Sequence, residues 1–135
     1  MKFFKTWAVS FISLVILDLL WIHWLAANFY FRYLSPLSQI NANGAINFHL
    51  LPGIIVYALL ALAFVVFTQA YSKRPFASFI AFSALLGFII YAVFDFTNLS
   101  FMSYWPITFA LADIVWGTVS FVITASILKA FVFKD

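Results

Sequence analysis

The stretch "FASFIAFSALLGFIIYAVFDFTN", residues 76–98, decides the fold of this 135-residue chain. Asp95 is its single charged side chain. A helix needs about 20 mainly apolar residues to cross the roughly 30 Å hydrocarbon core of a bilayer. The stretch therefore predicts a transmembrane helix, with an aspartate near one end that requires an explanation.

The composition of the whole chain agrees with a membrane protein. Hydrophobic residues make up 67% of the chain and charged residues 8%, against about 45–50% and about 25% in soluble domains. The basic residues occur singly or in pairs and form no basic face, so we expect the lipid bilayer as partner and no nucleic acid. The absence of cysteine excludes disulfides, thiolate nucleophiles and thiolate-held clusters.

Four apolar runs have the length of a membrane span, at about residues 5–27, 50–71, 76–98 and 105–128. The first resembles a signal peptide, but Asp18 and Trp21 interrupt it and "LAAN" at 25–28 is a poor cleavage site, so we expect it to remain as a span. The predicted fold class is all-α: one membrane domain over residues 1–135, folded as a four-helix transmembrane bundle.

The lysines and arginines predict the orientation. Six share one side of the predicted topology: Lys2, Lys5, Lys73, Arg74, Lys129 and Lys134. Only Arg32 falls on the other side. Positive residues are concentrated in cytoplasmic segments, so we expect both termini in the cytoplasm.

Three of the four acidic residues, Asp18, Asp95 and Asp113, fall within predicted spans. A carboxylate within the membrane costs at least about 2.5 kcal/mol, so such residues face the bundle interior or a water-filled cavity. At about 1.5 Å per residue, Asp18 and Asp113 lie about 13 Å below the outer helix ends, and Asp95 about 5–10 Å below. We expect a polar cluster in the outer half of the membrane.

Two helix faces support this cluster. One stripe with spacings of 4, 4, 4 and 3 consists of Ser83, Gly87, Tyr91, Asp95 and Asn98. Another, with spacings of 3, 4, 3 and 4, consists of Ala110, Asp113, Gly117, Ser120 and Thr124. Small residues let membrane helices approach closely, and polar ones bond across the interface. The third and fourth spans should therefore pack through these faces, with Asp95 and Asp113 meeting or sharing partners.

An Asp-x-x-Trp pattern occurs twice, as Asp18 to Trp21 and as Asp113 to Trp116. Three residues make about one helical turn, so each tryptophan lies beside its aspartate. A buried indole N–H needs an acceptor, and a carboxylate provides one. The pairs can satisfy each other within a helix or across helices.

The segments "LDLLW", "YAVFDFTNLS" and "ADIVWG" resemble the signature segments of a family of bacterial membrane proteins, domain of unknown function 2177. The resemblance covers nearly the whole chain. It implies a small four-helix inner-membrane protein and no established activity. The positions it marks are Asp18, Trp21, Asp95, Thr97, Asn98, Asp113, Trp116 and Gly117.

A metal site has little support in the sequence. The candidate ligands besides the aspartates are His23 and His49, and His23 lies about 140° around the helix from Asp18. We therefore predict no metal site, and the sequence identifies no cofactor, including a haem between the two histidines. No hydrolase triad, phosphate loop or zinc-binding helix is present.

Several functions remain open. The first is a membrane protein that binds protons, cations or a small solute through its aspartates, with a second copy or a partner subunit completing a transport path. The second is a non-catalytic membrane subunit or a lipid- or stress-related factor with structural aspartates. The third, an intramembrane lipid-modifying enzyme, lacks a recognisable nucleophile, so an enzyme is the less favoured interpretation.

Overall fold

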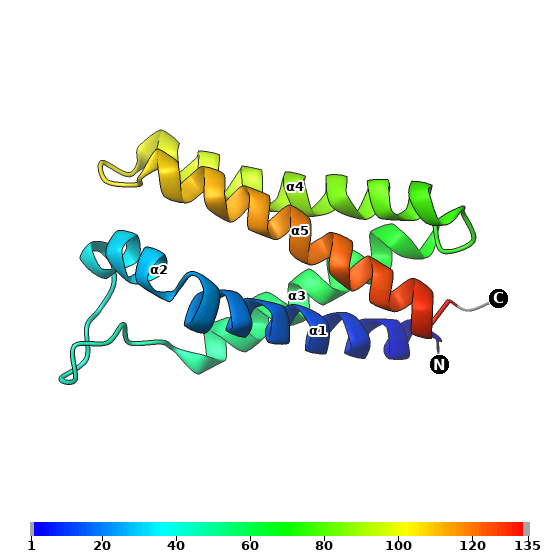
Figure 1. Cartoon of the computed structure of the whole chain (residues 1–135), viewed down its shortest axis with the longest axis horizontal. Coiled ribbons are helices and arrows are strands. Elements are labelled where there is room, and N and C mark those ends of the chain that lie inside the picture. The colour runs from blue at the N-terminus through cyan, green and yellow to red at the C-terminus, as the bar shows by residue number, and fades with distance from the viewer. Residues whose placement is uncertain (1, 134–135) are drawn as a thin grey trace.

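In the computed structural model, which describes residues 2–133, four long helices form an elongated bundle (Figure 1). The first span comprises α1 (Lys2–Leu20) and a π-helical turn (Trp21–Leu25). A shorter helix α2 (Ala27–Leu34) and a 3-10 turn (Ser35–Leu37) follow. The other long helices are α3 (Leu50–Gln69), α4 (Phe76–Phe101) and α5 (Ile107–Phe131).

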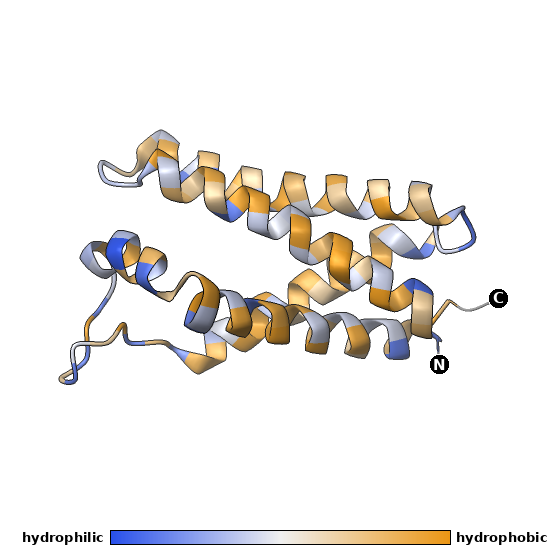
Figure 2. Cartoon of the chain, in the orientation of Figure 1, coloured by the Kyte–Doolittle hydropathy of each residue, from blue (hydrophilic) through white to orange (hydrophobic). Residues whose placement is uncertain are grey.

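The four-span prediction is confirmed. The helical segments Lys2–Leu25, Leu50–Gln69, Phe76–Phe101 and Ile107–Phe131 are each long and apolar enough to cross a membrane. Hydrophobic residues cover these helices, and hydrophilic residues gather mainly near the connections and helix ends (Figure 2). The all-α fold class is therefore correct for the described residues.

Some helix ends differ from the predicted ones by two or three residues. Helix α4 continues to Phe101, and α5 begins at Ile107 rather than 105. The later start has a steric cause, because a proline disfavours helical geometry in the residue before it. Pro106 is the extended N-cap of α5, so Trp105 belongs to the connection.

The first span is not one continuous α-helix. The Ala26 N–H donates a 2.7 Å hydrogen bond to the Trp21 carbonyl, five residues back, and Ala26 itself leaves helical geometry. A π turn inserts one extra residue and so rotates the side chains that follow. Helix α2 then begins in a new direction, and its Tyr30 is 8% exposed.

Helices α4 and α5 pack through their small residues, as the two stripes predict. A Cβ atom on Gly87 would lie 2.8 Å from the Gly117 carbonyl, closer than real Cβ contacts. Ser83, Gly87 and Asp95 are buried on α4, and Gly117 and Ser120 on α5. The glycines thus permit the close approach that brings the polar faces of α4 and α5 together.

Buried hydroxyl groups are satisfied largely within their own helices. Ser10 Oγ donates to the Thr6 carbonyl at 2.8 Å, and Ser83 Oγ donates to the Phe79 carbonyl at 2.9 Å. Thr68 makes the same type of bond to the Phe64 carbonyl. These hydroxyl groups lie in the apolar region and need no hydrogen-bond partner on another helix.

The two ends of the bundle differ in charge. We call the end with both termini and the α3–α4 hairpin the termini end, and the end with residues 26–49 and 102–106 the loop end (Figure 1). Five of the six described lysines and arginines, all except Arg32, belong to the termini end. Lys134 and Asp135 lie outside the described residues.

Candidate functional site

The most polar part of the helical bundle is an aspartate cluster toward the loop end, formed by Asp18, Asp95 and Asp113 with the aromatic side chains that bond them. Asp18 on α1 is 8% exposed. Its Oδ1 accepts a 2.6 Å hydrogen bond from the Trp116 indole, and its Oδ2 accepts a 2.8 Å bond from the Tyr57 hydroxyl. One carboxyl thus joins α1 to α5 and α3.

Asp113 on α5 is bonded by a residue of α2. The Tyr30 hydroxyl of α2 donates to Asp113 Oδ1 at 2.7 Å, and the Trp21 indole donates to the Tyr30 oxygen at 3.2 Å. Burial, reinforced by the neighbouring Asp113 carboxyl, raises the pKa of Tyr30. Tyr30 therefore keeps its proton and acts as the donor to Asp113.

The two Asp-x-x-Trp motifs pair with each other rather than within themselves. Trp116, from the second motif, bonds Asp18 of the first. Trp21, from the first, reaches Asp113 of the second through Tyr30. The indoles of Trp21 and Trp116 are stacked, with ring centroids 4.4 Å apart and an interplanar angle of 5°. Two links therefore join the first span to α5: Asp18 of α1 bonds Trp116, and Trp21 of the π turn reaches Asp113 through Tyr30.

Asp95 on α4 is fully buried, with 0% exposure. Its Oδ1 accepts a 3.1 Å hydrogen bond from the Trp105 indole, whereas its buried Oδ2 has no hydrogen-bond partner among the described residues. The Asp113 carboxyl lies within electrostatic reach of Asp95. The two carboxyls are therefore neighbours in the structure.

Tyr91 lies among these groups and depends on a glycine for its place. It interacts electrostatically with Asp18, Asp113 and Tyr57. A Cβ atom on Gly117 would lie 2.1 Å from the Tyr91 ring. Gly117, the residue after Trp116, thus leaves the space that the ring fills.

The other predicted candidates make no hydrogen bond to the three carboxyls in the described part of the chain. Thr97 is exposed and Asn98 half-buried, and neither side chain makes a hydrogen bond to the cluster in the described part of the chain. His23 is exposed in the π turn, and His49 Nε2 lies 3.4 Å from Gln39 Oε1. Within residues 2–133, no three His, Cys, Asp or Glu side chains are placed to hold a metal ion.

Two of the donors are aromatic residues of the connections between spans. Aromatic residues in such positions are typical anchors at the membrane interface, and Trp24, Tyr30, Tyr33, Tyr104 and Trp105 fit this pattern in the sequence. That is wrong for Tyr30, which is buried against Phe109 and bonds Asp113. Trp105 is half-buried and bonds Asp95. Tyr57 is not among the predicted site residues, although a phenol within the apolar run "GIIVYALLAL" indicates a buried polar group.

The fold and the cluster together define a class: a four-span helical membrane protein whose spans are bonded by intramembrane aspartates. The chain belongs to a family described as predicted membrane protein (DUF2177), whose sequence profile matches residues 3–129. This match confirms the resemblance seen in the sequence. No curated protein and no solved structure matches the chain.

Proposed function

We propose that the protein binds a proton between Asp95 and Asp113 and belongs to the ion-handling membrane proteins. The observation that carries this proposal is the fully buried Asp95 Oδ2, which has no hydrogen-bond partner among the described residues and lies beside a second carboxyl. Two carboxylates repel each other in a non-aqueous site, and a proton shared between them removes the repulsion and supplies the missing bond.

The hydrogen bonds around the pair suit this role. Trp105 bonds one oxygen of Asp95, and Tyr30 bonds one oxygen of Asp113. Both are donors, so each fixes the position of its carboxyl and leaves the second oxygen for the shared proton. Exchange of this proton with the aqueous phase would change the attraction between α4 and α5 at the loop end.

Transport of protons or another small solute is the activity that we infer for this site. Four helices enclose little volume, so we propose that a second copy or a partner membrane subunit completes the path. Native mass spectrometry in mild detergent and in lipid nanodiscs tests this step. A monomer in both environments, together with full proton flux, would contradict it.

We further propose that the chain resides in a bacterial inner membrane with both termini in the cytoplasm, which places the aspartate cluster in the outer half. The charge difference between the termini end and the loop end supports this orientation. Fusion of a reporter to the C-terminus tests it. Activity of a reporter that works only outside the cytoplasm would overturn the orientation.

Proton flux into vesicles tests the function. Purified protein is reconstituted with an entrapped pH dye, and a potassium gradient with valinomycin drives proton entry. The expected result is flux that Asp95→Asn abolishes and that Thr108→Val, a change at an exposed position of α5, leaves intact. Equal flux through wild-type and Asp95→Asn vesicles, or flux no greater than in empty vesicles, would overturn the proposal.

A second candidate is a non-catalytic membrane factor in which the aspartates serve only to hold the helices together. The observation that favours it is Asp18, whose two oxygens both have donors. Such a role predicts that aspartate-to-asparagine changes are mild, because an amide still forms hydrogen bonds. The flux measurement separates the two candidates.

A further inference from the structure

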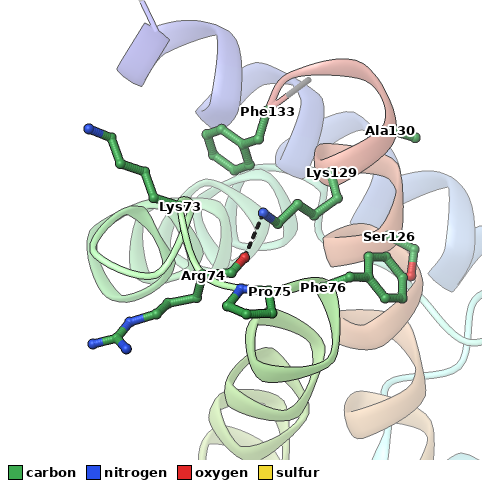
Figure 3. Close-up of a pocket in the computed structure, with 8 residues that line it drawn as sticks. All are labelled: Lys73, Arg74, Pro75, Phe76, Ser126, Lys129, Ala130 and Phe133. Atoms are coloured by element: carbon green, nitrogen blue, oxygen red, sulfur yellow. Dashed lines mark hydrogen bonds between the residues drawn. The ribbon is translucent and has the colours of Figure 1, made fainter. Parts of the chain in front are cut away.

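A second polar feature lies at the termini end, opposite the aspartate cluster. An open pocket of about 580 Å³ is formed by the α3–α4 hairpin and the last turns of α5 (Figure 3). Its lining residues include three cationic ones, Lys73, Arg74 and Lys129, and the aromatic Phe76 and Phe133. Among residues 2–133, which the structure describes, no carboxylate lines the pocket, and this lining suits an anion.

Lys129 is fixed in this pocket by the hairpin. Its Nζ donates to the Ser72 carbonyl at 2.6 Å and to the Arg74 carbonyl at 2.9 Å. An ammonium group has three N–H donors, so one remains beyond these two hydrogen bonds. Lys73 and Arg74 are exposed, and their side chains extend outward from the hairpin (Figure 3).

The start of α4 adds to the positive character of the pocket. Pro75 is the N-cap of this helix, and no side chain caps its first turn. The first N–H groups of a helix and its dipole attract anions. Pro75, Phe76 and Lys129 all line the pocket, so this helix end and the Lys129 ammonium group lie at the same site.

We propose that this pocket binds the phosphate group of an anionic phospholipid. The ligand chemistry is a phosphate ester, and the surroundings favour a lipid as its source. The pocket lies where the spans α4 and α5 end, which is the level of lipid headgroups. Phe76 is 58% exposed beside it, so acyl chains can cover the ring while the phosphate meets the cations. The site is independent of the aspartate cluster.

Binding of short-chain lipids to the full-length protein in zwitterionic detergent tests this proposal. Calorimetry at low salt compares phosphatidylglycerol, phosphatidylcholine and inorganic phosphate. The expected result is binding of phosphatidylglycerol alone. The double variant Lys73→Gln/Arg74→Gln should weaken it about thirtyfold, from about 1 kcal/mol per basic residue. Each single variant should weaken phosphatidylglycerol binding about fivefold. If the double variant does not fold, the single variants test the proposal in its place.

Two control variants separate a site from general charge attraction. Arg32→Gln removes one exposed charge at the loop end and should leave binding unchanged. Lys73→Arg/Arg74→Lys keeps the charge and should bind within a few-fold of wild type. Equal weakening by Arg32→Gln, or equal binding of phosphatidylcholine, would overturn the proposal. Equally tight binding of inorganic phosphate would identify a free anion as the ligand and overturn the lipid assignment.

Discussion

The Trp116 indole donates a 2.6 Å hydrogen bond to Asp18, 98 residues away in the sequence, and stacks on Trp21 at 4.4 Å. A single tryptophan thus joins the first and last spans by a polar bond and by an aromatic contact. The same two spans are joined a second time through Trp21, Tyr30 and Asp113.

Trp116→Phe should destabilise the fold while retaining an aromatic ring against Trp21. The substitution removes the indole N–H that donates to Asp18 Oδ1. Hydrogen bonds between membrane helices contribute about 0.6–1.7 kcal/mol to stability. The free energy of unfolding, measured by titrating SDS into mild detergent, should fall by about 1 kcal/mol. Trp24→Phe is the control, because Trp24 is 81% exposed. Equal losses from the two substitutions would show that the Asp18 bond is not the cause.

Asp18→Leu and Asp18→Asn should differ in their effects. Leucine leaves the Trp116 N–H and the Tyr57 O–H without their acceptor, and each unsatisfied buried group costs about 1–3 kcal/mol. We expect a loss of at least about 2 kcal/mol in the free energy of unfolding for leucine and less than about 1 kcal/mol for asparagine, whose amide still forms hydrogen bonds. The same SDS titration measures both, and a leucine variant as stable as the asparagine variant would contradict this role.

Gly117→Ala should separate α4 from α5. The added Cβ would lie 2.1 Å from the Tyr91 ring, which is packed against α5 and has little room to move. Overpacking of this kind costs about 1–3 kcal/mol. Gly53→Ala is the matched control: the three atoms nearest its Cβ would all belong to the Phe48 ring, which is 68% exposed and able to swing away. Thermal unfolding should show a large shift for the first variant alone.

Tyr30→Phe should release α2 from the bundle. The substitution removes the Tyr30 hydroxyl. Both the hydrogen bond to Asp113 and the hydrogen bond from the Trp21 indole are then lost. Hydrogen exchange should show faster exchange of the α2 amides, with α4 unchanged. Tyr33→Phe, at a half-buried tyrosine of the same helix, should leave α2 protected. Unchanged exchange in Tyr30→Phe would mean that packing against Phe109 alone holds α2.

The spans and the helix faces could be predicted because lipid imposes them. Long apolar runs must be helical in a bilayer. The stripes of small and polar residues with spacings of three and four, which contain Gly87 and Asp95 on one helix and Gly117 on the next, indicate which faces meet. The partners of the aspartates could not be predicted in this way. The spacing of Asp18 and Trp21 places them on one face but does not say which neighbouring helix supplies the donor.

The π turn after Leu20 and the buried position of Tyr30 also could not be predicted from the sequence. No proline or glycine marks the turn, so only the packing of the folded chain determines it. Aromatic residues in a loop between spans are typical of the membrane interface, and the same composition fits a helix that folds onto the bundle. To distinguish an interfacial loop from a helix packed onto the bundle, one must know that Asp113 has its hydrogen-bond donor on α2 and not on its own helix.

The shared proton between Asp95 and Asp113 is tested most directly by infrared spectroscopy of the protein in lipid. A protonated carboxylic acid has a carbonyl stretch that a carboxylate lacks. The wild type should show this band at neutral pH, and both Asp95→Asn and Asp113→Asn should remove its contribution while the helical amide signal remains. A wild-type spectrum without a protonated acid, or a band that survives both substitutions, would contradict the shared proton.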